Sequence, residues 1–439
     1  MKKLVLVLLL LLLAIPVWGI DFLNFPNFPS RAGSGSSFDK KYWWDTGALT
    51  FYAPFTDPDN PLRLIKGTGS LSFTRATTAT YVHPTTGLIT SAASGQLRIE
   101  SNGALIEGQR TNLLLQSENL GAAWSTVRAI ISLDVLISPS GDTTADKIID
   151  TDVEGTHRIY QTYDSFAAGT DYVISGYLKA GGRDWFKLGF DLGTPLGVMF
   201  NLSNGTIGTE DAGYTGTITS FGNGWYRCEV KTNTAAFSGP GTVELGLASN
   251  GSPLSYVGDN TSGIYGWGLS MGSASFPSSY IPTTTAAVTR NLDSLSVASS
   301  GNIDNTAGTL YTLWTPNFAN TVTASGNYYI FDAGGFEAYW NSTDDKIYLT
   351  DGTNTISTAA LTFSADAAKD LAFTWGAAGL SITVDGTDTT GATYTSSVFG
   401  ASIFFGADTT PANLLYGHHK NTRIWNRQFS VAERGTIAP

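Results

Sequence analysis

The sequence has a single cysteine, Cys228, among its 439 residues. One thiol excludes an intrachain disulfide framework and any zinc site that needs several cysteines. We interpret Cys228 as a small buried hydrophobic residue on a strand. Histidine is almost as scarce, with four residues, and no Gly-x-Ser-x-Gly motif stands near any of them. A Ser-His-Asp catalytic set is therefore not indicated.

Charged residues are also few, at 14% of the chain, and the formal net charge at pH 7 is −11. Lys and Arg are spread thinly, so no basic stripe is present to neutralise phosphates, and nucleic acid is not an expected partner. No long amphipathic helix is visible, and a helical signal appears only near the end, where Ser430 and Glu433 have the spacing of a capping box. The 49 glycines separate short runs of aromatic and β-branched residues. This pattern predicts an almost entirely β protein.

The amino end differs in kind from the rest of the chain. Lys2 and Lys3 precede an apolar run from Leu4 to Ala14, which is typical of an export signal. We expect residues 1–19 to be a signal peptide cleaved after Gly19, or alternatively a retained membrane anchor and the chain's only membrane contact. The run is shorter than the ~20 residues of a full membrane span. Residues 20–41 mix prolines and glycines and predict a flexible leader.

The remaining residues are too many for one ordinary hydrophobic core. Short alternating runs over residues 42–110 predict a small β module. Stronger strand patterns predict one sandwich over residues 111–290 and a second over residues 300–439. Ile281-Pro282 and the threonines after them resemble a connector, so we expect the two sandwiches to be separate folding units.

Two regions resemble known families. Residues of about 70–290 are similar to a module of tailed-phage structural proteins, which implies a jelly-roll related to carbohydrate-binding modules. The motifs that carry this resemblance are FTRATTATYV at 73–82, RTNLLLQS at 110–117, SGYLKAG at 175–181, GNGWYR at 222–227, YGWG at 265–268 and SSYIPT at 278–283. Residues from about 300 onward resemble laminin-G-like, or concanavalin A-like, sandwiches. Their motifs are LSITVDGT at 380–387, IFFGA at 403–407 and TRIWNRQFS at 422–430. The expected fold is therefore a pair of tandem antiparallel β-sandwiches.

These resemblances imply a non-enzymatic virion surface or tail-associated structural protein. We expect it at the virion or the extracellular cell surface, as a homo-oligomer that contacts other virion proteins and a host-surface glycan. An exported bacterial lectin-like adhesin is the alternative that the amino-terminal segment keeps open. A polysaccharide hydrolase ranks third, because glutamates such as Glu100, Glu107, Glu229 and Glu337 are scattered singly rather than set in a Glu-x-Asp-x-Glu strand pattern.

Sugar binding needs an exposed aromatic ring beside polar partners. Trp185, Tyr339 and Trp340 lie beside polar turns, and we predict them as the glycan-contacting residues. No cofactor is expected. Calcium is the only ion that the resemblance suggests, with loop carboxylates as ligands. The candidate calcium ligands are Asp332, Asp344, Asp345, Asp351 and Asp385. The adjacent His418 and His419 would point to opposite faces of a strand, which disfavours a shared metal ion, and we expect them in a surface loop.

Overall fold

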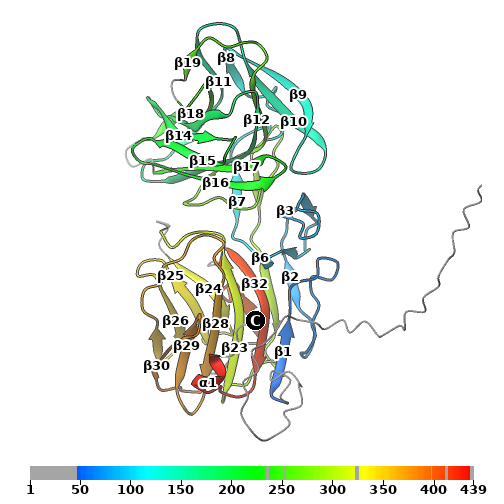
Figure 1. Ribbon diagram of the computed structural model, residues 1–439. Helices are drawn as coiled ribbons and strands as arrows, with labels where there is room; N and C mark the ends of the chain where they lie inside the picture. Colours follow the sequence, from blue (N-terminus) through cyan, green and yellow to red (C-terminus); the bar gives the residue numbers. More distant parts are fainter. Residues whose placement is uncertain are drawn as a thin grey trace, which may run out of the picture. The chain divides into compact units, whose positions relative to one another are not determined.

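The computed structural model describes residues 47–233, 237–251, 254–321, 326–396, 398–410 and 414–435. All of these residues belong to one compact unit, Thr46–Pro439. The signal-peptide and leader predictions for residues 1–19 and 20–41 lie outside them. Antiparallel strands dominate, and α1 (Val431–Arg434) is one short helix with the predicted capping box (Figure 1). The all-β prediction is confirmed. No helix in the described ranges is long and apolar enough to cross a membrane.

One sandwich is built from residues between Leu114 and Ser273, and its two sheets enclose a single hydrophobic core. The six-stranded sheet runs in the order β16 (Tyr214–Gly222), β17 (Trp225–Asn233), β12 (Asp171–Gly181), β20 (Gly263–Ser273), β10 (Thr143–Asp150) and β9 (Ala129–Ile137). The facing sheet runs β15 (Thr206–Glu210), β14 (Pro195–Asn201), β13 (Trp185–Asp191), β18 (Gly239–Ala248), β11 (Gly155–Phe166) and β19 (Ser255–Tyr256), with β8 (Ser125–Val127) also on β11. Alternate residues such as Phe186, Leu188 and Phe190 fill the core, as strand periodicity requires.

A second sandwich has its own core. Its eight-stranded sheet runs β30 (Thr387–Ala392), β29 (Leu380–Val384), β28 (Lys369–Trp375), β23 (Gly308–Pro316), β32 (Gly417–Trp425), β6 (Gly103–Ile106) and β5 (Arg98–Glu100), with β1 (Leu49–Ala53) also on β32. The facing sheet runs β2 (Ser72–Thr74), β22 (Ser294–Ala298), β31 (Ser402–Phe405), β24 (Asn327–Asp332), β25 (Glu337–Asn341), β26 (Lys346–Thr350) and β27 (Thr355–Ser357). We call it the composite sandwich, because its strands come from both ends of the described chain.

The prediction of a separate small module over residues 42–110 is wrong. Strands β1, β2, β5 and β6 from this segment complete the sheets of the composite sandwich, and Phe51 and Ile106 are buried in its core beside residues such as Trp314. Phe51 pairs with Ile424, close to the other end of the chain. Local patterning predicted strands here, but it carries no information about such distant partners. Within this segment, β3 (Ala79–Val82) and β4 (Ile89–Ala92) form a two-stranded sheet of their own. Strands β5 and β6 also pair with each other, but β6 continues the sheet onto β32.

The other sandwich is therefore an insertion into the composite sandwich. The chain leaves through β7 (Arg110–Asn112) and returns through β21 (Val288–Arg290), and these two strands pair with each other. We call the segment between them the inserted sandwich. Its two ends lie together, since the Leu113 amide donates to the Met271 carbonyl at 2.8 Å.

A buried ion cluster lies where the chain enters and leaves the insertion. Three arginines, Arg75, Arg98 and Arg290, share the carboxylates of Glu107 and Asp293, and all five side chains are at most 1% exposed. Arg98 contacts Glu107 at 2.7 Å and Asp293 at 2.5 Å, while Arg75 reaches Asp293 at 3.1 Å. Burial alone would raise the pKa of Glu107, but Arg290 and Arg98 hold it well below its usual range. Segments distant in sequence are thus held by charge pairing in the interior.

Candidate functional site

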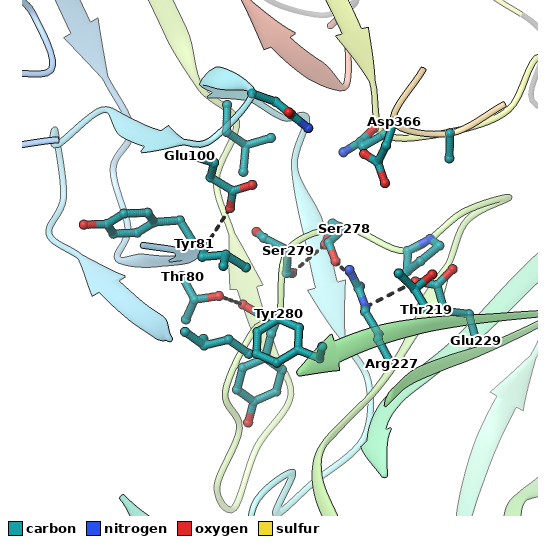
Figure 2. Close-up of a pocket in the computed structure, with 18 of the residues that line it drawn as sticks. Thr80, Tyr81, Glu100, Thr219, Arg227, Glu229, Ser278, Ser279, Tyr280 and Asp366 are labelled. Carbon is teal, nitrogen blue, oxygen red and sulfur yellow. Dashed lines mark hydrogen bonds and ion pairs between the residues drawn. The ribbon is translucent and has the colours of Figure 1, made fainter. Parts of the chain in front are cut away.

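A cleft of about 420 Å³ has a lining of varied chemistry (Figure 2). Its walls come from the β3–β4 hairpin, the end of β5, β16, β17, the segment before β21 and the 365–366 turn. Hydroxyl groups of Thr80, Thr219, Ser278 and Ser279 and carboxylates of Glu100, Glu229 and Asp366 line it. Such a lining offers many hydrogen-bond donors and acceptors to a ligand rich in hydroxyl groups.

One wall is fixed by Glu100 and His418. The Glu100 carboxylate accepts a hydrogen bond from the Val82 amide at 2.8 Å, and its other oxygen lies 3.0 Å from His418 Nε2. His418 is 3% exposed, and its Nδ1 is buried without a hydrogen-bond partner among the described residues. The pair on β32 is therefore not in a surface loop as predicted, although its two side chains do diverge. His419 lies in the core beside Thr312, and burial, with His418 adding, lowers its pKa to about 3.

The opposite wall carries Arg227 and Glu229, which are two residues apart on β17 and therefore lie on the same face of the sheet. Arg227 Nε lies 3.2 Å from Glu229 Oε1, and Arg227 Nη2 donates to the Ser278 carbonyl at 2.7 Å. Burial raises the pKa of Glu229, Arg227 opposes that shift, and the charge of Asp366 adds to it. Figure 2 shows Asp366 on the far side of the cleft from Glu229. The cleft thus holds carboxylates in different electrostatic environments.

The three predicted glycan-contacting aromatics lie elsewhere. Trp340 has no exposed surface and packs against Phe318 and Tyr328, with ring centroids 5.4 and 5.1 Å apart. That prediction is wrong, because the alternation of β25 turns Trp340 inward and only Tyr339 outward. Trp340 contributes to core stability, where truncating a tryptophan typically costs about 3–5 kcal/mol.

Tyr339 is half-buried, and its ring lies between two other tyrosine rings. Its centroid lies 5.3 Å from Tyr329 on one neighbouring strand and 5.3 Å from Tyr348 on the other, where the rings stack. The stacking on Tyr348 occupies one face of the Tyr339 ring. Trp185 is also half-buried, and its ring packs over the backbone at Gly208 and Gly251. The structure brings neither residue to the cleft.

The five predicted calcium ligands do not converge. Asp332 and Asp351 accept hydrogen bonds from turn amides, such as that of Gly334 at 2.7 Å and that of Asn354 at 2.6 Å. Asp385 pairs with Lys369 at 2.7 Å, and Asp344 with Lys346 at 3.4 Å. Asp345 occupies a turn with φ of +58°. Within the described ranges, no three His, Cys, Asp or Glu side chains are placed to hold a metal ion.

Sequence reasoning missed the residues that do meet in the cleft. Glu229 and Glu100 were among the glutamates regarded as scattered, Asp366 belonged to no motif, and Arg227, which ends the GNGWYR motif, was assigned no role in a site. One local signal was available, since Arg227 and Glu229 are spaced by two on a strand and must share a face. Whether this shared face points toward the cleft or away from it depends on the topology, and the sequence pattern does not specify the topology.

Comparisons with known proteins give distant likenesses only. No protein-family model matches the chain, and no curated protein matches it. Among solved structures it is similar to a mutant Trypanosoma rangeli sialidase with trans-sialidase activity, at 15% identity and a TM-score of 0.25, over 30% of this chain and 23% of that one. It is similar to a candidate carbohydrate-binding protein from Bacteroides ovatus, at 11% identity and a TM-score of 0.26, over 65% of this chain and 79% of that one.

Mouse laminin α1 domains LG4-5 give 10% identity and a TM-score of 0.21, over 64% of this chain and 90% of theirs. The chain spans about a quarter of the length of the sialidase. Likenesses at these TM-scores carry no argument about ligand or activity.

Proposed function

We propose that this protein is a non-enzymatic adhesion protein that binds a glycan in the cleft of Figure 2. The observation that supports it is the lining, which combines fixed carboxylates, an arginine and hydroxyl groups in an open volume of about 420 Å³. Carboxylate and hydroxyl oxygens accept hydrogen bonds from sugar hydroxyls, and charge-assisted bonds are the stronger ones. The half-buried ring of Phe221 adds an apolar surface within the same cleft.

The biological setting that we propose is the surface of a virion or of a cell. The motifs between residues 73 and 283 resemble phage structural proteins, and this resemblance supports a tail-associated or other virion role over that of an exported bacterial adhesin. Either setting requires the same chemistry from the cleft. Particle co-purification separates the two, because a virion component accompanies purified particles whereas a secreted adhesin is released alone.

The decisive test is Glu229→Gln, with binding to isolated host-surface polysaccharide measured by calorimetry. The substitution keeps the size of the side chain but removes its charge, and losing a charge-assisted hydrogen bond of about 1.5–3 kcal/mol weakens binding roughly 10- to 100-fold. Glu244→Gln is the matched control. Like Glu229, Glu244 forms an ion pair with an arginine, in this case Arg158 at 3.1 Å on the neighbouring strand, but it lies outside the cleft. Equal binding by both variants would refute the cleft as the glycan site.

A hydrolase is the second candidate, because Glu229 has a raised pKa and stands across the cleft from Asp366. Burial raises the pKa of Asp366 as well, and glycosidases place two carboxyl groups on either side of the bond that they cleave. The same polysaccharide serves as substrate in an assay for reducing ends. Release by the wild type that Glu229→Gln abolishes would establish hydrolysis, and absence of release with retained binding supports the adhesion protein.

A further inference from the structure

The outer strand of the six-stranded sheet, β9 (Ala129–Ile137), concentrates exposed apolar side chains. Ten large hydrophobic side chains are exposed in the described part of the chain, and four of them lie on this strand. They are Ile130, Leu133, Val135 and Ile137, which are 48%, 46%, 47% and 60% exposed. Exposed apolar side chains gathered on one strand in this way are typical of an interaction site.

The backbone of β9 adds a second, directional feature. β9 pairs with β10 along one edge only, and no strand among the described residues pairs with its other edge (Figure 1). Natural sheets protect such edges with lysines, prolines or short strands. β9 has nine residues, no lysine and no proline, and Asp134 is its single charge. The Asp134 amide donates to the Asp146 carboxylate at 2.9 Å, and the other amide and carbonyl groups along this free edge select an extended strand as the partner rather than a helix or a sugar.

We propose that β9 is the contact between two copies of this chain, which pair β9 with β9 in antiparallel orientation about Leu133. This inference is independent of the glycan cleft and goes beyond the function proposed above. In this register Ile130 faces Leu136, Ile131 faces Val135 and Ala129 faces Ile137, so every apolar residue meets an apolar one. Asp134 faces Ser132, which can donate to its carboxylate. A twofold contact must be complementary to itself, and this sequence is.

The faces of the sheet agree with that register. Ile131 packs toward the core of the inserted sandwich, whereas Leu136 packs against a separate cluster that includes Trp267 on the other face. The partners on β10 carry this assignment across the bulge, because Ile130 lies opposite Ile149 and Leu136 opposite Ala145, four residues apart on one face of β10. Val135, next to Leu136, then lies on the same face as Ile131. Residues that oppose each other in an antiparallel pair share a face, so both pairs are sterically consistent.

Charge and shape disfavour other pairings. A register centred on Asp134 would place the two carboxylates directly opposite each other, and like charges there are destabilising. Asp134 also has φ of +54° and bulges the strand where its pairing with β10 is interrupted. A bulge bends an edge away from arbitrary strands. A second copy has the same bulge. In a pair centred on Leu133 the two bulges are related by the twofold axis, each opposite Ser132 of the other copy.

Cysteine cross-linking of the full chain tests the register. Residues opposed in an antiparallel pair have Cα atoms about 4.5–5.5 Å apart, which suits a disulfide. Leu133→Cys is therefore expected to form a cross-linked dimer under mild oxidation. Ile130→Cys alone is expected to stay uncross-linked, and to cross-link only when mixed with Leu136→Cys. The native Cys228 is buried and is common to every variant.

Light scattering after size exclusion tests the surface itself. The wild type is expected to be a dimer at micromolar concentration, and Val135→Lys a monomer, because each lysine would face the apolar Ile131. Val257→Lys is the matched control, since Val257 is 61% exposed but lies outside β9, and it is expected to leave the dimer intact. A monomeric wild type, an oligomer unchanged by Val135→Lys, or cross-linking of Ile130→Cys alone would each overturn the proposal.

Discussion

Replacing Asp293 by asparagine should destabilise the composite sandwich severely. Asp293 accepts from Arg75 at 3.1 Å, from Arg98 at 2.5 Å and from the Glu107 amide at 2.8 Å. The cluster has three arginines and two carboxylates, so the substitution raises its formal charge from +1 to +2 without access to solvent. Breaking a buried ion pair on one side costs about 3–5 kcal/mol, because the partner charges stay buried and uncompensated.

Urea unfolding followed by tryptophan fluorescence measures this loss. With m-values of about 1–3 kcal/mol/M for small domains, the transition of the composite sandwich should move by more than about 1 M. Asp385→Asn is the control, since it removes an ion pair with Lys369 at 2.7 Å whose carboxylate is 45% exposed. Such a pair contributes about 0–1 kcal/mol.

The location of the loss is as informative as its size. Hydrogen exchange should accelerate in β5 and β6, which carry Arg98 and lead to Glu107, and much less in β13 and β18 of the inserted sandwich. A loss for Asp293→Asn no larger than that for Asp385→Asn would refute the reasoning. It would mean that the cluster is hydrated and that its charges are screened.

Two further outcomes are expected. Replacing residues 114–270 with a short glycine linker should leave a composite sandwich that unfolds cooperatively, because Leu113 and Met271 are already hydrogen-bonded to each other. Residues 300–439 alone should not fold, because they lack β1, β2, β5, β6 and β22. Thermal melts of both fragments, followed by circular dichroism, test these two outcomes. Burial, with Asp332 and Asp408 adding, raises the pKa of Glu337 from 4.5 to about 7, so ionising Glu337 opposes folding and stability falls as pH rises through that window. Glu337→Gln should raise the free energy of unfolding by on the order of 1–2 kcal/mol above the window, seen as a higher Tm, and leave both unchanged below it; a constant difference across pH would contradict the assignment.

Local sequence was sufficient for the fold class. Glycine and asparagine turns between runs such as those around Tyr172 and Trp225 predict strands because both signals act over a few residues. The capping box at Ser430 and Glu433 could be predicted for the same reason. The exposure of individual aromatic rings could not be predicted in this way. Tyr339 and Trp340 are neighbours in similar sequence contexts, and only the orientation of β25 decides which of them is buried.

By itself, then, the sequence determined the β class, the turns, the one short helix and the two resemblances, all of which depend on residues close together in the chain. The tertiary structure alone decided that β1 and β6 belong with β32, and that one sandwich is inserted into the other. It also decided that Glu100, Glu229 and Asp366 meet in one cleft. The physical reason is that strand pairing and side-chain convergence depend on long-range registers, and the period-2 pattern of a single strand does not specify its partner.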